Sequence, residues 1–97
     1  MNLYNLHTDK SKLLNFEREE ELMWTVASTN NYPNGEIEYI NVFGNFSKKD
    51  GPAKIIKSII GNEEYWYKNG LLHREDGPAV SGGYLPTEYW VNGVKSK

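Results

Sequence analysis

An internal repeat limits what this chain can fold into more than any other feature of its sequence. Residues 64–79 read Glu-Tyr-Trp-Tyr-Lys-Asn-Gly-Leu-Leu-His-Arg-Glu-Asp-Gly-Pro-Ala, and residues 38–53 align with them without a gap and end in the same Asp-Gly-Pro-Ala. A shorter third copy starts with Glu-Tyr-Trp at residues 88–90 and reaches its Asn-Gly pair one residue early. A repeat of this length marks a supersecondary unit that must pack on its neighbours to bury its apolar side chains. We therefore expect function to lie on a surface that several units build.

The length and composition predict a single domain with a thin core. A 97-residue domain buries only about two thirds of the surface that its unfolded chain exposes. Aromatic residues make up 13% of the chain, which is high, and they supply the bulk that aliphatic residues do not. We divide the single domain 1–97 into an N-terminal helical segment (1–21), a first hairpin with a degenerate repeat (22–53), a second repeat (54–79) and a truncated third repeat (80–97).

The local patterns predict an α+β fold that is mainly β. Residues 10–20 contain helix formers behind a Thr-Asp N-cap, which predicts a short helix. Alternating apolar residues predict a strand over residues 22–27, and a second extended pattern over residues 36–43 follows a cluster of turn residues. We expect a short N-terminal helix followed by antiparallel β-hairpin repeats forming one sheet, with about six or seven strands.

Two kinds of turn recur in the repeat. Asn-Gly pairs suit type I′ turns, because both central residues of such a turn need positive φ. In Asp-Gly-Pro-Ala, the Asp can accept backbone N–H groups and the Pro fixes φ where the next strand begins. Arg74 lies two residues before Asp76 and can pair with it across the corner, as Lys48 can with its own Asp. The turn residues are Asp50, Gly51, Pro52, Asn69, Gly70, Asp76, Gly77, Pro78, Asn92 and Gly93.

The sequence predicts no enzyme, no metal site and no cofactor. It has no cysteine, which suits a reducing compartment and makes the cytoplasm the expected location. His7 and His73 are the only histidines, and nothing in the sequence brings them to one substrate atom. The scattered carboxylates lack the ligand spacing of a zinc site. We find no signal-peptide pattern and no apolar run long enough to span a membrane, so no membrane partner is expected.

The aromatic residues of the repeats allow two interpretations. Successive side chains of a strand point to opposite faces, so a thin sheet with one helix cannot bury all of them. They can form cross-strand pairs that hold the sheet together. They can also form a contact surface, because Trp, Tyr and Arg dominate binding hot spots. The residues that we select as a protein interface are Trp66, Tyr67, Arg74, Tyr89 and Trp90.

An RNA-binding module is the alternative. Bases of single-stranded RNA stack on aromatic side chains, and basic residues neutralise its phosphates. The candidate phosphate contacts are Lys48, Lys49, Lys54 and Lys57. The net charge of −2 and the pI near 5.6 argue against this alternative.

The best-preserved copy of the repeat, residues 65–79, resembles a repeat found in many copies in proteins of bacteriophages and giant DNA viruses. The resemblance is partial in the other two copies, and it covers residues 36–97 in all. Residues 3–9, Leu-Tyr-Asn-Leu-His-Thr-Asp, also look like the opening of a group of small phage proteins. The resemblance implies a β-rich structural module with no reaction attached, in a small phage accessory protein.

These observations lead to a non-catalytic, protein-binding function. By analogy with other small phage proteins, we expect an inhibitor that occludes or sequesters a host enzyme, for example one of antiphage defence. We also expect a homodimer, because a final strand over residues 87–91 would leave an open sheet edge. A self-assembling structural repeat protein is the third possibility.

Overall fold

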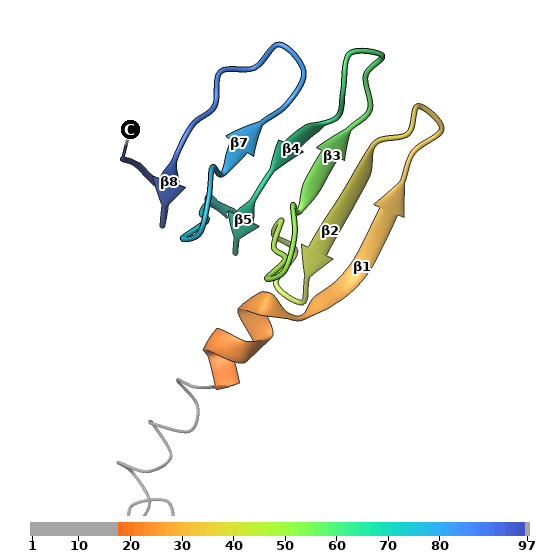
Figure 1. Cartoon of the computed structure of the whole chain (residues 1–97). Coiled ribbons are helices and arrows are strands. Elements are labelled where there is room, and N and C mark those ends of the chain that lie inside the picture. The colour runs from red at the N-terminus through yellow and green to blue at the C-terminus, as the bar shows by residue number, and fades with distance from the viewer. Residues whose placement is uncertain (1–17, 97) are drawn as a thin grey trace, which may run out of the picture.

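The computed structural model describes residues 18–96, which form one helical segment and nine short strands (Figure 1). The helix covers residues 18–24. The strands are β1 (Val26–Asn31), β2 (Ile37–Asn41), β3 (Lys54–Ile56), β4 (Glu63–Tyr65), β5 (Tyr67–Lys68), β6 (Leu71–Leu72), β7 (Val80–Ser81), β8 (Trp90–Val91) and β9 (Val94–Lys95). The predicted class, α+β and mainly β, is confirmed.

The strands lie side by side in a single layer that follows the order of the repeats (Figure 1). Five of them form an antiparallel sheet in the order β1-β2-β3-β4-β7, while β5-β6 and β8-β9 are separate two-stranded hairpins. The expected single sheet is thus divided into three sheets, one with five strands and two with two strands. Trp66 shows why, because it donates its N–H to Ala79 O in the sheet (2.7 Å) and accepts the N–H of His73 in its own hairpin (2.9 Å). At Trp66, between β4 and β5, the chain stops pairing with the five-stranded sheet and starts pairing within its own hairpin.

The strand predicted over residues 22–27 is wrong in its first half. Residues 22–24 belong to the helix, and the helix ends where Thr25 donates its N–H to Leu22 O (3.1 Å) and its hydroxyl to Glu21 O (2.9 Å). The extended chain starts only at β1. A tertiary contact overrides the local preference, because the carbonyl of Met23 accepts hydrogen bonds from Asn41 and Ser47 of the first unit. The helix expected over residues 10–17 lies outside the described residues.

Backbone hydrogen bonds define the repeat more sharply than the sequence alignment does. Tyr39 donates its N–H to Ala53 O (2.8 Å), as Trp66 does to Ala79 O (2.7 Å). Tyr39 is therefore equivalent to Trp66, although the gap-free alignment places it opposite Tyr65. The difference of one residue arises because the turn of the first unit is built differently from the Asn-Gly turns.

Each Asn-Gly turn docks on the unit before it. As predicted, both residues have positive φ: 46° and 87° in the second unit, 49° and 79° in the third. Gly70 donates its N–H to Phe46 O (2.8 Å), and Gly93 donates its N–H to Leu72 O (2.9 Å). The preceding Asn N–H bonds a side chain in both units, Ser47 Oγ (3.0 Å) in one and His73 Nδ1 (2.9 Å) in the other.

The core is as thin as the length predicts. Among the described residues, the buried apolar side chains are Ala53, Ala79 and Val80, and the buried polar ones are Asn41, Ser47 and His73. The two alanines close the Asp-Gly-Pro-Ala corners, where a small side chain lets neighbouring units approach. Cohesion therefore depends on hydrogen bonds between units and on half-buried aromatic side chains.

Candidate functional site

One face of the sheet carries a stack of a cation on an aromatic ring in each of the first two units. The Lys48 ammonium lies 3.8 Å from the centre of the Tyr39 ring, and the Arg74 guanidinium carbon lies 3.7 Å from that of Trp66. The backbone bonds make both partners equivalent, since Lys48 and Arg74 each donate an N–H to the hairpin strand of the next unit. We call this side of the sheet the corner face. The stack therefore recurs from unit to unit, although the gap-free alignment does not place Tyr39 opposite Trp66.

The guanidinium of Arg74 is held from three sides. Its Nε donates to Asp76 Oδ1 (2.9 Å), its Nη1 donates to Pro78 O (3.2 Å), and its plane covers Trp66. The hydrogen bond from Arg74 lowers the pKa of the Asp76 carboxyl. A side chain at Gly77 would push against the guanidinium, because a Cβ would lie 2.8 Å from its central carbon. The predicted pairing across this corner is confirmed.

The first corner differs. The Lys48 ammonium lies over Tyr39 and forms no ion pair with Asp50 among the described residues, so the pairing suggested for this corner is not found. Lys49 and Asp50 are exposed. The first corner therefore offers exposed charges of both signs, where the second corner offers a guanidinium held by Asp76 and Pro78.

An open groove of about 510 Å³ lies between the two corners and the end of the helix, and we call it the corner groove. It is lined by Trp24, Lys48, Lys49, Asp50, Trp66, His73, Arg74, Glu75 and Asp76. Two indoles supply its apolar wall, and each corner supplies both basic and acidic groups. The buried Nε1 of Trp66 has no hydrogen-bond partner among the described residues. The groove thus combines aromatic surface with charges of both signs.

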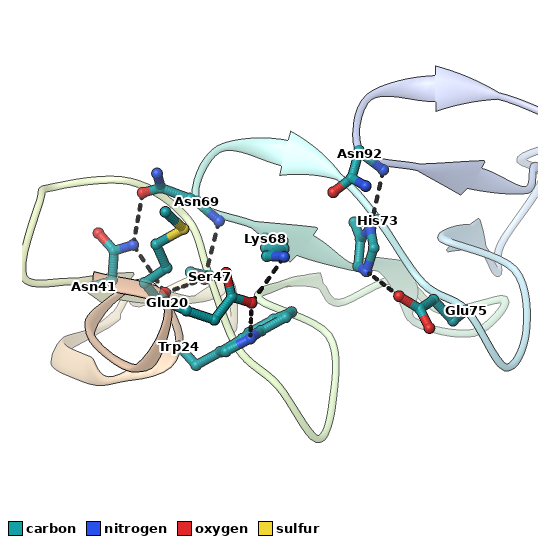
Figure 2. A network of polar contacts seen from close by, with 10 residues as sticks. Glu20, Trp24, Asn41, Ser47, Lys68, Asn69, His73, Glu75 and Asn92 are labelled. Carbon is teal, nitrogen blue, oxygen red and sulfur yellow. Dashed lines mark hydrogen bonds and ion pairs between the residues drawn. The ribbon is translucent and has the colours of Figure 1, made fainter. Parts of the chain in front are cut away.

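Sequence reasoning missed three residues of the groove lining, namely Trp24, His73 and Glu75, and Trp24 is the largest of them. Its Nε1 donates to Glu20 Oε2 (3.3 Å), and the same carboxylate bonds the Lys68 ammonium (2.9 Å; Figure 2). The bond from Lys68 lowers the pKa of Glu20. The Trp24 ring lies 6.1 Å from that of His73, which places the helix over the junction of the units. The available signal was the i, i+4 spacing of Glu20 and Trp24, which fits a helix better than a strand.

His73 is buried and fixed at both nitrogens. Nδ1 accepts the N–H of Asn92 (2.9 Å), so Nε2 carries the proton and faces Glu75 Oε2 at 3.3 Å (Figure 2). His7 lies outside the described residues, so the structure does not address an acid–base pair with it. No three His, Cys, Asp or Glu side chains between residues 18 and 96 gather to hold a metal ion.

The other three interface candidates, Tyr67, Tyr89 and Trp90, do not line the corner groove. Tyr67 packs on Phe46, with ring centres 5.2 Å apart, on the opposite face. Trp90, its equivalent in the third unit, donates Nε1 to Glu88 Oε1 (2.9 Å). Tyr89 is half-buried and equivalent to Trp66. Of the five selected residues, Trp66 and Arg74 line the corner groove.

The four lysines do not form one patch. Lys48 and Lys49 line the corner groove. Lys54 lies opposite Glu38 in the register and so points to the other face, where it pairs with Glu36 (3.7 Å). Lys57 follows β3 and is exposed. The geometry gives no continuous path for a phosphate backbone along these side chains.

No helix within the described part of the chain is long and apolar enough to cross a membrane. Comparisons of the chain with family models, with curated proteins and with solved structures found no match.

Proposed function

We propose that this is a non-catalytic binding protein that holds a segment of a protein partner in the corner groove. The stack of Arg74 on Trp66 carries the proposal, because Arg and Trp side chains dominate the energetics of protein interfaces. The guanidinium is already held by Asp76 and Pro78, so binding costs little of its conformational entropy. The groove has basic and acidic groups in both corners, which suits a partner segment with charges of both signs next to an apolar side chain.

The resemblance of residues 36–97 to a repeat of phages and giant viruses supports the biological setting. We propose a phage accessory protein that acts in the host cytoplasm and occludes or sequesters a host enzyme, such as one of antiphage defence. A thin, repeated sheet is suited to cover a surface, since it offers two broad faces. The RNA-binding alternative loses support from the separation of its four lysines.

Affinity capture from nuclease-treated bacterial lysate tests the groove. Trp24→Ala and Arg74→Ala should each release a stoichiometric protein partner that the wild-type chain retains. Tyr84→Ala is the matched control, because this tyrosine is 88% exposed and lies outside the groove lining. If the wild-type chain and the three variants retain the partner equally, the proposal that the corner groove binds it is refuted. Retention of RNA alone without nuclease would favour the alternative, and an empty column would favour a structural protein.

We propose that the homodimer forms through β1, which is a longer edge than the one expected at residues 87–91. Among the described residues, β1 is a six-residue strand that pairs only with β2, whereas the stretch 87–91 has one bridge, from Glu88 to Val80, and its last two residues pair with β9. Thr29 lies opposite Tyr39, whose N–H points away to Ala53, so the peptide groups of Thr29 face outward. The strand has no charged side chain, so a second copy can pair with it antiparallel without repulsion.

A proline pair tests this edge by sedimentation velocity at tens of micromolar. Thr29→Pro removes an outward N–H and should leave a folded monomer, whereas Ser28→Pro removes an inward N–H and should destabilise the sheet. A wild-type monomer under these conditions would rule out the dimer.

A further inference from the structure

We propose that His73 makes the docking of the third unit depend on pH. The inference concerns the joint between the second and third units and is independent of the proposed function. It starts from the acceptor that each unit offers to the Asn-Gly turn of the next: a serine hydroxyl in the first unit and an imidazole nitrogen in the second. Only the imidazole changes its charge near neutral pH, between about pH 5 and about pH 8.

The hydrogen bond at Nδ1 determines how protonation of His73 would affect the joint. Nδ1 of His73 accepts the backbone N–H of Asn92 at 2.9 Å, and the ring is 7% exposed. An imidazolium carries a proton on both nitrogens and accepts no hydrogen bond. Once Nδ1 is protonated, two N–H groups face each other at the joint, so the Asn92 turn must move away.

The surroundings of His73 can accommodate the charged form. Glu75 Oε2 lies 3.3 Å from Nε2 on the same corner, so the Nε2 proton has an acceptor in both forms of the ring. The other charged side chains of the groove are Lys48, Lys49 and Asp50 on the first corner and Arg74 and Asp76 on the second. Arg74 is bonded to Asp76. From the helix, the uncharged ring of Trp24 faces His73, and the nearby Glu20 is bonded to Lys68. The third unit contributes a backbone N–H.

The remaining bonds of the third unit do not titrate in this range. Arg74 N–H bonds Trp90 O (2.9 Å), Gly93 N–H bonds Leu72 O (2.9 Å), and Ala79 N–H bonds Glu88 O (2.8 Å). Protonation therefore loosens the turn without detaching the whole unit. The loss of this part-buried hydrogen bond corresponds to up to about tenfold more frequent opening.

Hydrogen exchange of the full chain at about pH 8 and about pH 5, corrected for the intrinsic exchange rates, tests the proposal. Protection of the amides of Asn92 and Gly93 should fall by up to about tenfold on acidification. Asn69 and Gly70, docked on Ser47 and Phe46, are the internal control and should keep their protection. Unchanged protection of Asn92 and Gly93, or an equal loss at both turns, would overturn the inference.

Two variants separate the imidazole from general acid sensitivity. His73→Ser copies the first joint and should make the protection of the Asn92 turn independent of pH. His73→Asn puts a side-chain amide oxygen, which does not titrate, in reach of the Asn92 N–H and should likewise remove the pH dependence. If His73→Ser unfolds the third unit at every pH, His73→Asn decides, and a pH-dependent loss of protection that persists in His73→Asn refutes the proposal.

Discussion

Replacement of Ser47 by alanine tests the claim that hydrogen bonds between units, and not a thick core, hold this fold together. Ser47 is fully buried and joins three elements, because its hydroxyl donates to Met23 O of the helix and accepts the N–H of Asn69. Alanine has nearly the same shape, so no cavity arises. The carbonyl of Met23 keeps its bond from Asn41 (3.0 Å), but the N–H of Asn69 loses its side-chain acceptor.

A buried donor without a partner costs about 1–3 kcal/mol, so we expect Ser47→Ala to lower the free energy of unfolding by about 2 kcal/mol. For a domain of this size, that lowers the melting temperature by about 10 °C. Urea unfolding followed by tryptophan fluorescence measures the change. Ser58→Ala is the control, because the hydroxyl of Ser58 is exposed and accepts only a long bond from Ile60 (3.3 Å), and it should cost under about 0.5 kcal/mol. A cost for Ser47→Ala as small as that of the control would refute the reasoning.

Two further predictions concern backbone strain and acid stability. Gly82→Ala should destabilise the protein far more than Gly44→Ala in thermal melts. Both glycines have positive φ (103° and 84°), but only the Cβ at Gly82 would collide with the carbonyl of Asn62. Gly44→Ala should cost only the backbone strain of about 1–2 kcal/mol, and equal costs for the two variants would contradict this prediction. The pKa of Glu20 is lowered by Lys68, so their ion pair stabilises the protein above the ordinary carboxyl pKa of 4.5 and this contribution is lost as the pH falls through the lowered value. The Glu20 side chain is 47% exposed, so Glu20→Gln should cost under about 1 kcal/mol at neutral pH and nothing in strong acid, and an equal cost in urea titrations at both pH values would speak against the ion pair.

The parts of the fold that depend on a few adjacent residues could be predicted from the sequence. Asn69 and Asn92 adopt positive φ because a type I′ turn requires it and Asn-Gly tolerates it. Arg74 pairs with Asp76 because residues two apart on an extended segment share a face. The mainly β class follows from the same local patterns.

The parts that depend on contacts between distant segments could not be predicted. The helix extends to residue 24 because Met23 accepts bonds from the first unit, and no local pattern encodes that contact. The local sequence pattern therefore predicts a strand at Trp24 and gives no sign that this residue belongs to the site. The equivalence of Tyr39 and Trp66, hidden by a shift of one residue, became visible only from their bonds to Ala53 and Ala79.

The regular docking of each Asn-Gly turn on the preceding unit has a consequence for how such a chain can grow. Each joint uses backbone and side-chain groups of the adjacent unit, so an in-frame duplication of residues 54–79 would bring its own donors, acceptors and corner. Every added copy would also bring another cation stacked on an aromatic ring, at the same spacing along the sheet. Lengthening the gene in this way multiplies the contact sites on one rigid scaffold, and a partner with matching spacing would be held by avidity.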